Sequence, residues 1–357
     1  MPTEPERLHR RAPLQAAAHL FVTAMALAAS ACAADEAPTG PELAPSSASE
    51  ATRRYAVRDL GTLGGSYSYA LGINRRAEVV GVSATAAGQQ RAFRWKQGTM
   101  IDLGTLDPSG GSSGASGINA AGHVVGTSAS AEGIARAFLW RDGVMTELVT
   151  HGGTSGANAI NDLGQIVGYA GLQAETRPAL WQNGTVTDLG TLGGPFGEAT
   201  DINDQGQVVG GTRVSFEDDT QIHAFLWENG VMSDLGTLGG PTSWAQAINE
   251  NGDIVGWSET AERETHAVVW KNGRMLDLGL LGENYTHAYG INDDGVKVGF
   301  ATGGDGGPVV WVYRKGQRLP MLAGKGGDAT DINDRGQIVG SSHRRNGQQR
   351  AVLWRLE

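Results

Sequence analysis

The chain has 357 residues, of which 40% are hydrophobic, 54 are glycine and a single one is cysteine. Its 38 acidic and 28 basic residues leave a formal net charge of −10, so a basic surface large enough to bind nucleic acid is not expected. One cysteine also excludes a disulfide framework and a CxxC metal site.

The first 31 residues predict an export signal that is not part of the fold. A basic start is followed by an apolar run rich in Ala, Leu and Val, which ends in small residues before Cys32. This position of Cys32 resembles the bacterial lipoprotein signal, in which the cysteine is acylated, although Ala29 stands where leucine is commonest. We expect a lipid anchor at Cys32; the alternative is simple secretion after cleavage near Ala31 or Ala33. Either way the protein is expected in the cell envelope or outside the cell.

Residues 32–53 predict a disordered tether, because they are rich in Ala, Pro, Ser and Glu and contain almost no large apolar side chains. Residues 54–357 predict a single repeat domain. An Ile-Asn pair recurs there every 41 to 46 residues, with its asparagine at Asn74, Asn119, Asn161, Asn203, Asn249, Asn292 and Asn333. A tryptophan follows each pair, at Trp95, Trp140, Trp181, Trp227, Trp270, Trp311 and Trp354. This period is typical of propeller blades.

Each repeat predicts four short antiparallel strands. The first ends in Ile-Asn, the second is a Val-Val-Gly run, the third contains Ala-Phe-Leu-Trp and the fourth ends in Asp-Leu-Gly. Asn-x-x-Gly connects the first two strands as a tight hairpin, except that Ala77 replaces the glycine in the first repeat. Asn-Gly or Asp-Gly connects the last two, which is the strongest short-range signal of a hairpin.

The two ends of the repeat domain complement each other. Tyr55–Gly61 matches a fourth strand without a third, and 351–357 matches a third strand without a fourth. Pairing of these segments would remove two free sheet edges, which a closed ring can do and an open solenoid cannot. We therefore predict an all-β fold: a seven-bladed β-propeller of four-stranded antiparallel blades, closed by pairing of Tyr55–Gly61 with the last blade.

Alanine stands four residues before each repeated asparagine, at Ala70, Ala115, Ala157, Ala199, Ala245, Ala288 and Ala329. We expect these small side chains on the face of the innermost strands that converges on a central channel. Close approach between stacked layers is the alternative.

The combined phrase of Asp-Leu-Gly-Thr-Leu-Gly-Gly, Ile-Asn-x-x-Gly-x-Val-Val-Gly and His-Ala-Phe-Leu-Trp resembles the HAF repeat, a bacterial extracellular repeat. The resemblance covers 55–357 and implies export and a repeat-built β domain. It implies no activity and supplies no catalytic residues.

Charged positions recur with the repeat. Arg or His stands four residues before six of the tryptophans, and Asp or Glu begins six of the Asp-Leu-Gly phrases. Both positions fall on one face of the hairpin, so we expect cross-strand charge pairs; a basic ligand-binding ring is the alternative.

No motif of a metal site, a phosphate loop or a hydrolase is present. The segments Asp201–Gly206 and Asp331–Gly336 bear a distant likeness to a calcium loop, but they lack the required spacing of oxygen ligands and the distal glutamate. We expect no cofactor and no calcium.

The position five residues before each asparagine varies most between repeats. It places Tyr69, Glu198, Trp244, His287 and Asp328 at one mouth of the predicted channel, where stacking and hydrogen bonds would hold a ligand. The leading hypothesis is a non-catalytic, exported, monomeric propeller that binds a glycan, a small molecule or a protein there. The alternatives are a polysaccharide lyase or hydrolase using His287 with Glu198 or Asp328, a purely structural surface protein, and simple solvation of these five positions.

Overall fold

The structure, a computed structural model, describes residues 54–150, 152–172, 175–218, 220–280, 285–302, 308–313, 317–323 and 326–357. The predicted export signal (1–31), lipidation site (Cys32) and tether (32–53) lie outside these residues. The described residues belong to one structural unit, Ser47–Glu357. Every regular element within them is a strand, and none of them forms a helix able to cross a membrane.

One repeat shows why the sequence folds into four strands. It comprises β14 (Gly197–Ile202), β15 (Val208–Arg213), β16 (Ile222–Glu228) and β17 (Val231–Asp234). The Oδ1 atom of Asn203 accepts hydrogen bonds from the backbone N–H groups of Gln205 and Gln207 at 3.1 and 3.0 Å, which caps the first turn. Asn229 and Gly230 form the last turn with φ angles of 52° and 83°, as a two-residue hairpin requires.

The other repeats follow the same order. The first three comprise β2 (Gly64–Ile73), β3 (Val79–Thr85), β4 (Gln90–Lys96), β5 (Thr99–Asp102), β6 (Ser113–Ile118), β7 (Val124–Ala129), β8 (Ala135–Arg141), β9 (Val144–Glu147), β10 (Ser155–Ile160), β11 (Ile166–Leu172), β12 (Glu175–Gln182) and β13 (Thr185–Asp188). The last three comprise β18 (Gly239–Ile248), β19 (Ile254–Thr260), β20 (Thr265–Lys271), β21 (Arg274–Asp277), β22 (Tyr285–Ile291), β23 (Lys297–Thr302), β24 (Pro308–Tyr313), β25 (Gln317–Arg318), β26 (Gly327–Ile332), β27 (Ile338–His343) and β28 (Gln349–Leu356).

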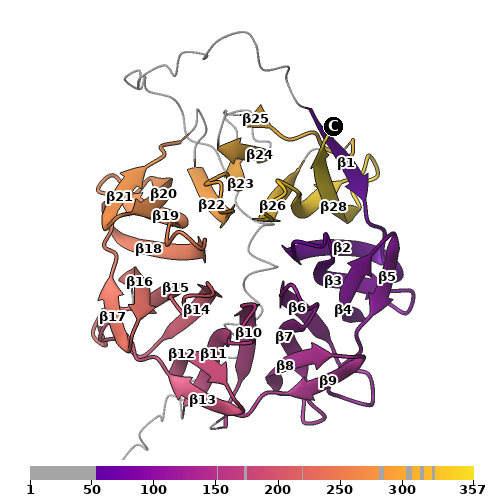
Figure 1. The fold of residues 1–357 in the computed structure, drawn as a ribbon, viewed down its shortest axis with the longest axis horizontal. Coiled ribbons are helices and arrows are strands. Elements are labelled where there is room, and N and C mark those ends of the chain that lie inside the picture. The colour runs from indigo at the N-terminus through magenta and orange to yellow at the C-terminus, as the bar shows by residue number, and fades with distance from the viewer. Residues whose placement is uncertain are drawn as a thin grey trace, which may run out of the picture. The chain divides into compact units, whose positions relative to one another are not determined.

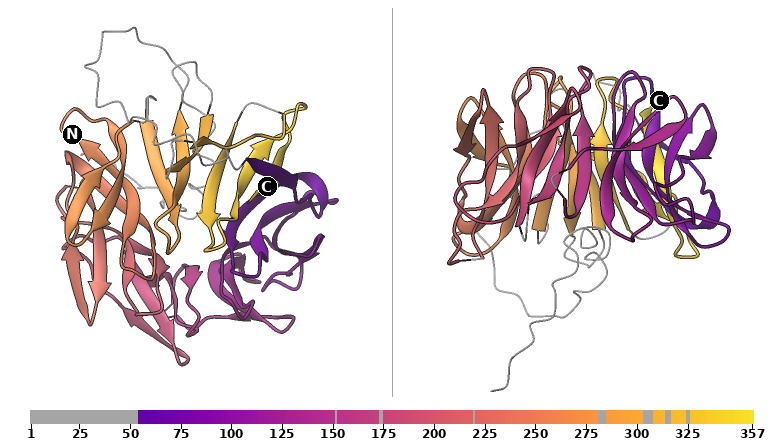
Figure 2. Two further views of the ribbon diagram at one scale, coloured as in Figure 1. Left: turned by 45° about the horizontal axis from the view of Figure 1, so that its top comes forward. Right: turned by 90° about the horizontal axis from the view of Figure 1, so that it is seen from below.

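These strands form antiparallel sheets. Among the described residues, five sheets have four strands each, and a sixth has eight strands. The eight-stranded sheet contains β14–β17 and β18–β21, which meet through one parallel pair of residues, Ile222 and Thr242. The five four-stranded sheets form five blades of a propeller, because all sheets stand around a common central opening (Figures 1 and 2). In Figure 1, β2, β6, β10, β14, β18, β22 and β26 are the innermost strands.

The first strand of the domain, β1 (Tyr55–Asp59), lies in the same sheet as the last repeat, as the sequence predicts. It pairs antiparallel with β28, from Tyr55 opposite Leu356 to Asp59 opposite Val352. The backbone N–H of Leu60 then donates to the carbonyl of Ala351 at 2.9 Å. The two ends of the domain are thereby held side by side.

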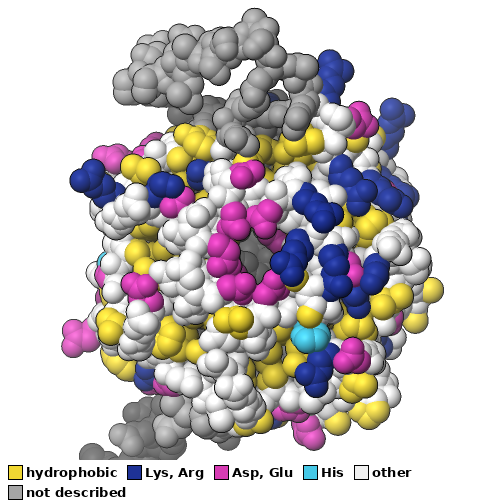
Figure 3. All heavy atoms as spheres, in the orientation of Figure 1, with side chains coloured by type: hydrophobic (Ala, Val, Ile, Leu, Met, Phe, Trp, Pro, Cys, Tyr) yellow, Lys and Arg dark blue, Asp and Glu magenta, His cyan; other side chains and the backbone are white. Residues whose placement is uncertain are grey.

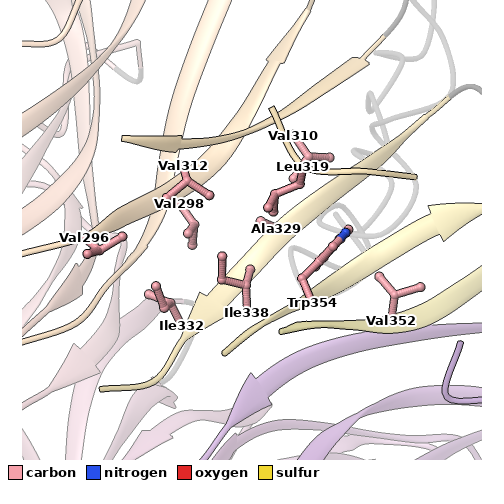
Figure 4. Close-up of a cluster of buried hydrophobic side chains, with 10 residues drawn as sticks. All are labelled: Val296, Val298, Val310, Val312, Leu319, Ala329, Ile332, Ile338, Val352 and Trp354. Carbon is pink, nitrogen blue, oxygen red and sulfur yellow. The ribbon is translucent and has the colours of Figure 1, made fainter. Parts of the chain in front are cut away.

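The hydrophobic core is divided into clusters that lie between neighbouring sheets. One cluster, drawn in Figure 4, joins side chains of β23, β24, β26, β27 and β28 with two residues just outside strands, Val296 and Leu319. Its other members are Val298, Val310, Val312, Ala329, Ile332, Ile338, Val352 and Trp354. Each sheet therefore buries apolar surface against its neighbour, as expected for a repeat fold.

The seven repeated alanines do not lie where the sequence predicts, on the face that lines the central channel. All seven are 0% exposed and lie in or beside these inter-sheet clusters, so they do not line the channel. Their place in the buried clusters agrees with the alternative considered above, close approach between stacked layers. A β-bulge follows each of these alanines and shifts the strand's alternation by one residue, for example between Ala199 and Asp201.

Candidate functional site

A belt of asparagine hydrogen bonds surrounds the central opening at the ends of the inner strands. The side-chain amide of each repeated asparagine donates to the backbone carbonyl of the asparagine in the next repeat, at 3.0 to 3.2 Å. The seventh bond runs from Asn333 back to Asn74. The same side chains accept backbone N–H bonds within their own turns, so their oxygens and amides are occupied by protein.

A second belt lies one residue further along and consists of carboxylates. The side chains of Asp162, Asp204, Glu250, Asp293 and Asp334 each accept a hydrogen bond from the backbone N–H of the preceding repeat, at 2.7 to 3.1 Å. We call this set the carboxylate belt. Figure 3 shows acidic side chains gathered around the central opening, with basic side chains on one side of it.

The negative charges of this belt interact. Burial raises the pKa of Glu250, and the nearby carboxylates of Asp204, Asp293 and Asp162 raise it further. The opening therefore carries a negative field that disfavours adding more negative charge.

Two more carboxylates lie just before the asparagines. Asp201 accepts hydrogen bonds from the backbone N–H of Ile202 and, in the next repeat, of Ile248, both at 2.9 Å. Asp331 accepts equivalent bonds from Ile332 and Ile73 at 2.7 and 2.8 Å.

Burial raises the pKa of Asp201 to about 7, with a further contribution from the charge of Asp331. Burial likewise raises the pKa of Asp331 to about 6. Both carboxyl groups therefore titrate close to neutral pH. Each carboxyl group connects two neighbouring inner strands through its hydrogen bonds.

The five residues predicted to bind a ligand all lie within inner strands and are half-buried: Tyr69 in β2, Glu198 in β14, Trp244 in β18, His287 in β22 and Asp328 in β26. Each stands directly opposite a residue of the second strand in its own sheet. They occupy equivalent levels of different repeats.

Trp244 and Glu198 both adjoin Gly211 of β15. Glu198 pairs with Gly211 of that strand, and the Trp244 ring lies against the same glycine, where a Cβ atom would be 2.3 Å from Cε3 of the indole. Only glycine fits under this ring. Asn158 donates to Glu198 at 2.6 Å, while burial raises the pKa of Glu198. The indole Nε1–H of Trp244 is buried and has no hydrogen-bond partner among the described residues.

His287 belongs to an aromatic cluster between β19 and β22. Its ring stacks on Trp257 with a centroid distance of 5.1 Å and an interplanar angle of 8°. Tyr285 packs edge-on at 4.7 Å, and the Tyr289 hydroxyl lies 3.3 Å from Nδ1 of the imidazole. Burial lowers the pKa of His287 to about 3, so the ring is neutral at physiological pH.

Tyr69 and Asp328 interact electrostatically. Burial and the charge of Asp328 raise the pKa of Tyr69, and Asp328 has a similar effect on Tyr289. The Asp328 carboxylate accepts hydrogen bonds from the backbone N–H and hydroxyl of Ser341 at 3.0 and 2.6 Å. No hydrogen bond in the described part of the chain joins His287 to Glu198 or Asp328.

The side chains at the predicted cross-strand positions meet in four repeats, as arginine–carboxylate pairs in two and as histidine–carboxylate contacts in two. Their N–O distances are 3.8 Å for Arg91–Asp102, 3.4 Å for Arg136–Glu147, 2.7 Å for His223–Asp234 and 2.9 Å for His266–Asp277. Two arginines deviate: Arg177 pairs with Glu175 at 2.9 Å, and Arg350 donates to the carbonyl of Ser66 at 2.7 Å.

Sequence reasoning missed both the carboxylate belt and the paired roles of Asp201 and Asp331. A signal was present, because the residue after the repeated asparagine is acidic in five repeats. Among the described residues, no group of three or more His, Cys, Asp or Glu side chains is arranged to hold a metal ion.

Comparison with known proteins supports the fold alone. No protein-family model matches the chain, and no curated protein matches its sequence. The propeller domain of the Trilobed protease from Pyrococcus furiosus is similar over 82% of this chain and 96% of its own, with a TM-score of 0.54 and 10% identity.

TolB from Acinetobacter baumannii is similar over 81% of this chain and 67% of its own, with a TM-score of 0.50 and 11% identity. An acylaminoacyl peptidase from Pyrococcus horikoshii has the same TM-score and identity, and this chain spans about half of its length, 53%. These likenesses show a propeller and leave the activity open.

Proposed function

We propose that this protein is an exported, non-catalytic, seven-bladed propeller that binds a glycan or another small polyhydroxylated molecule on its inner strands. The single observation that carries the binding proposal is the buried indole N–H of Trp244, which has no hydrogen-bond partner among the described residues. Buried polar groups without a partner are rare, and a ligand oxygen would supply the missing acceptor. Glu198, which pairs with the glycine beneath the Trp244 ring, offers an acceptor for a ligand hydroxyl.

The proposed count of seven blades treats the eight-stranded sheet as two blades that touch through one residue pair. Each half, β14–β17 and β18–β21, repeats the four-strand order of the other blades. The seven asparagine bonds return to their starting residue, and the inner strands β26 and β2 are in contact. Both observations support a ring closed by β1.

We propose that the protein does not catalyse a reaction, because the His287 side chain is poorly suited to act as a base. A pKa of about 3 makes its imidazole a weak base at neutral pH, and its ring is engaged by Trp257 and Tyr289. A lyase or hydrolase using this histidine with Glu198 or Asp328 would need the pair within hydrogen-bond reach of a common substrate atom. Aromatic faces beside a carboxylate instead suit stacking and hydrogen bonding of a polar ligand.

Export and lipid anchoring at Cys32 are proposed from the sequence, with the resemblance to the HAF repeat in support. Labelling of cells with a fatty acid analogue tests the anchor. We expect label on the native chain and none on Cys32→Ser. If the native chain is secreted without label, Cys32 is not acylated and the export signal is removed by simple cleavage.

The test of binding is a glycan array and thermal-shift screen of the full chain, repeated with Trp244→Phe. This variant keeps an aromatic ring and removes the indole N–H, so we expect at least tenfold weaker binding of any ligand found. Phe216→Ala, which changes an exposed side chain elsewhere, is the matched control and should leave binding unchanged. A ligand that binds Trp244→Phe equally well would refute this site. Cleavage of a bound glycan would refute the non-catalytic assignment.

A further inference from the structure

The carboxylate belt has a gap at the first two repeats. In repeats two to six, the backbone N–H of the residue after the asparagine is capped by a carboxylate from the following repeat. The N–H of Asp334 would need an acceptor at position 75, and the N–H of Arg75 would need one at position 120. These positions hold Arg75 and Ala120, whose side chains cannot accept a hydrogen bond.

Neither N–H finds another acceptor among the described residues. Arg75 and Asp334 are both exposed residues. At the five capped positions a carboxylate occupies the corresponding place, which shows that the turn geometry suits a carboxylate oxygen. Charge-assisted bonds of this kind are about twice as strong as neutral ones.

The surroundings of the gap are basic, unlike the rest of the opening. The Arg75 side chain is 68% exposed, and its Nη1 atom lies 3.6 Å from Oδ2 of Asp162. Arg76 donates to the backbone carbonyl of Ala120, which holds its guanidinium beside the missing cap. Arg335 is exposed on the turn that carries Asp334. Figure 3 shows basic side chains gathered on one side of the opening.

We propose that this gap is a docking site for an acidic segment of a partner protein, whose Asp or Glu side chains cap the N–H groups of Arg75 and Asp334. Side-chain carboxylates already perform this role five times in the belt. Two vacant N–H groups in adjacent repeats suit two carboxylates of one segment. The five carboxylates of the belt repel an acidic segment everywhere except at the gap. The partner therefore binds at one side of the opening. This site is independent of the proposed ligand site at Trp244.

The decisive variant is Ala120→Asp, which supplies from the chain itself one of the two missing carboxylates, the one that would cap the N–H of Arg75. The matched control is Ala121→Asp, which adds the same charge at the next, exposed residue but outside the belt position. Tetraglutamate serves as the probe with the full chain. Binding is followed by the NMR shifts of the Arg75 and Asp334 amides at low salt.

We expect tetraglutamate to shift both amides of the native chain, and its dissociation constant to rise at least tenfold in Ala120→Asp and less than threefold in Ala121→Asp. Ala120→Asp should also melt at a higher temperature than Ala121→Asp, because it completes a cap. If both variants weaken tetraglutamate binding equally, the loss reflects general repulsion between negative charges, and the proposal is overturned. Tighter binding of trigalacturonate than of tetraglutamate, lost in Ala120→Asp, would overturn the protein partner in favour of a uronate glycan.

Discussion

The side-chain amide of Asn333 donates a hydrogen bond of 3.0 Å to the backbone carbonyl of Asn74, although the two residues are 259 positions apart. Each of the other six repeated asparagines makes the same bond to the next repeat. The belt thus connects the last repeat to the first by the contact that connects all other neighbours.

Replacement of a belt asparagine should destabilise the protein strongly. Asn161→Ala removes a buried acceptor of the Gln165 N–H and the donor to Asn203, so we expect a loss of about 2–4 kcal/mol in the free energy of unfolding. Asn333→Ala should lose a similar amount if the ring is closed. Urea denaturation measures both, and Glu217→Ala, which changes an exposed side chain away from the belt, is the control. A much smaller loss for Asn333→Ala would mean that the closing link contributes little.

Stability should fall as the pH rises towards neutral. The folded pKa values of Asp201 and Asp331, about 7 and about 6, lie above the ordinary value of 3.8. Their contribution is therefore fully present below about pH 4 and is lost as the pH rises through 6 and 7. Asp201→Asn removes this titration and should flatten the decline between pH 5 and pH 8. Chemical denaturation at a series of pH values measures the slope; an unchanged slope would contradict the assignment.

Gly211 and Trp244 should be energetically coupled. Gly211→Ala places a methyl group where the indole lies, so we expect a loss of about 1–3 kcal/mol from overpacking. In a Trp244→Ala background the same change should cost at least about 1 kcal/mol less. A double-mutant cycle by thermal or urea unfolding measures the coupling. Additive losses would show that the ring does not lie on this glycine in solution.

Ala77 should be a point of backbone strain. Its φ angle is 59°, in the left-handed region that its equivalents fill with glycine. Ala77→Gly relieves this strain, and we expect a gain of about 0.5 kcal/mol after the added flexibility of the unfolded chain is subtracted. Gly164→Ala at an equivalent turn, where a Cβ would contact nothing within 4 Å, should lose about 1 kcal/mol. The denaturation midpoints of the two variants show whether each one gains or loses stability. A loss of stability in Ala77→Gly would contradict the backbone strain at Ala77.

The local structure of each repeat could be predicted from the sequence, because its causes are local. The alternation of apolar residues and the Asn-x-x-Gly and Asn-Gly turns determine the four strands without reference to distant residues. The pairing of β1 with β28 was also predictable, because two incomplete repeats at the ends leave complementary free edges.

Only the tertiary structure determines which way each inner-strand side chain faces and which residues it contacts. The sequence shows seven equivalent alanines, but only the packing of the folded chain shows that they are fully buried and do not line the channel. The carboxylate belt and the raised pKa values of Asp201 and Asp331 depend on contacts between residues 41 or more positions apart. Such contacts arise from the arrangement of sheets around the opening, which local propensity does not encode. The gap at Arg75 and Ala120 therefore becomes visible only when the repeats stand side by side.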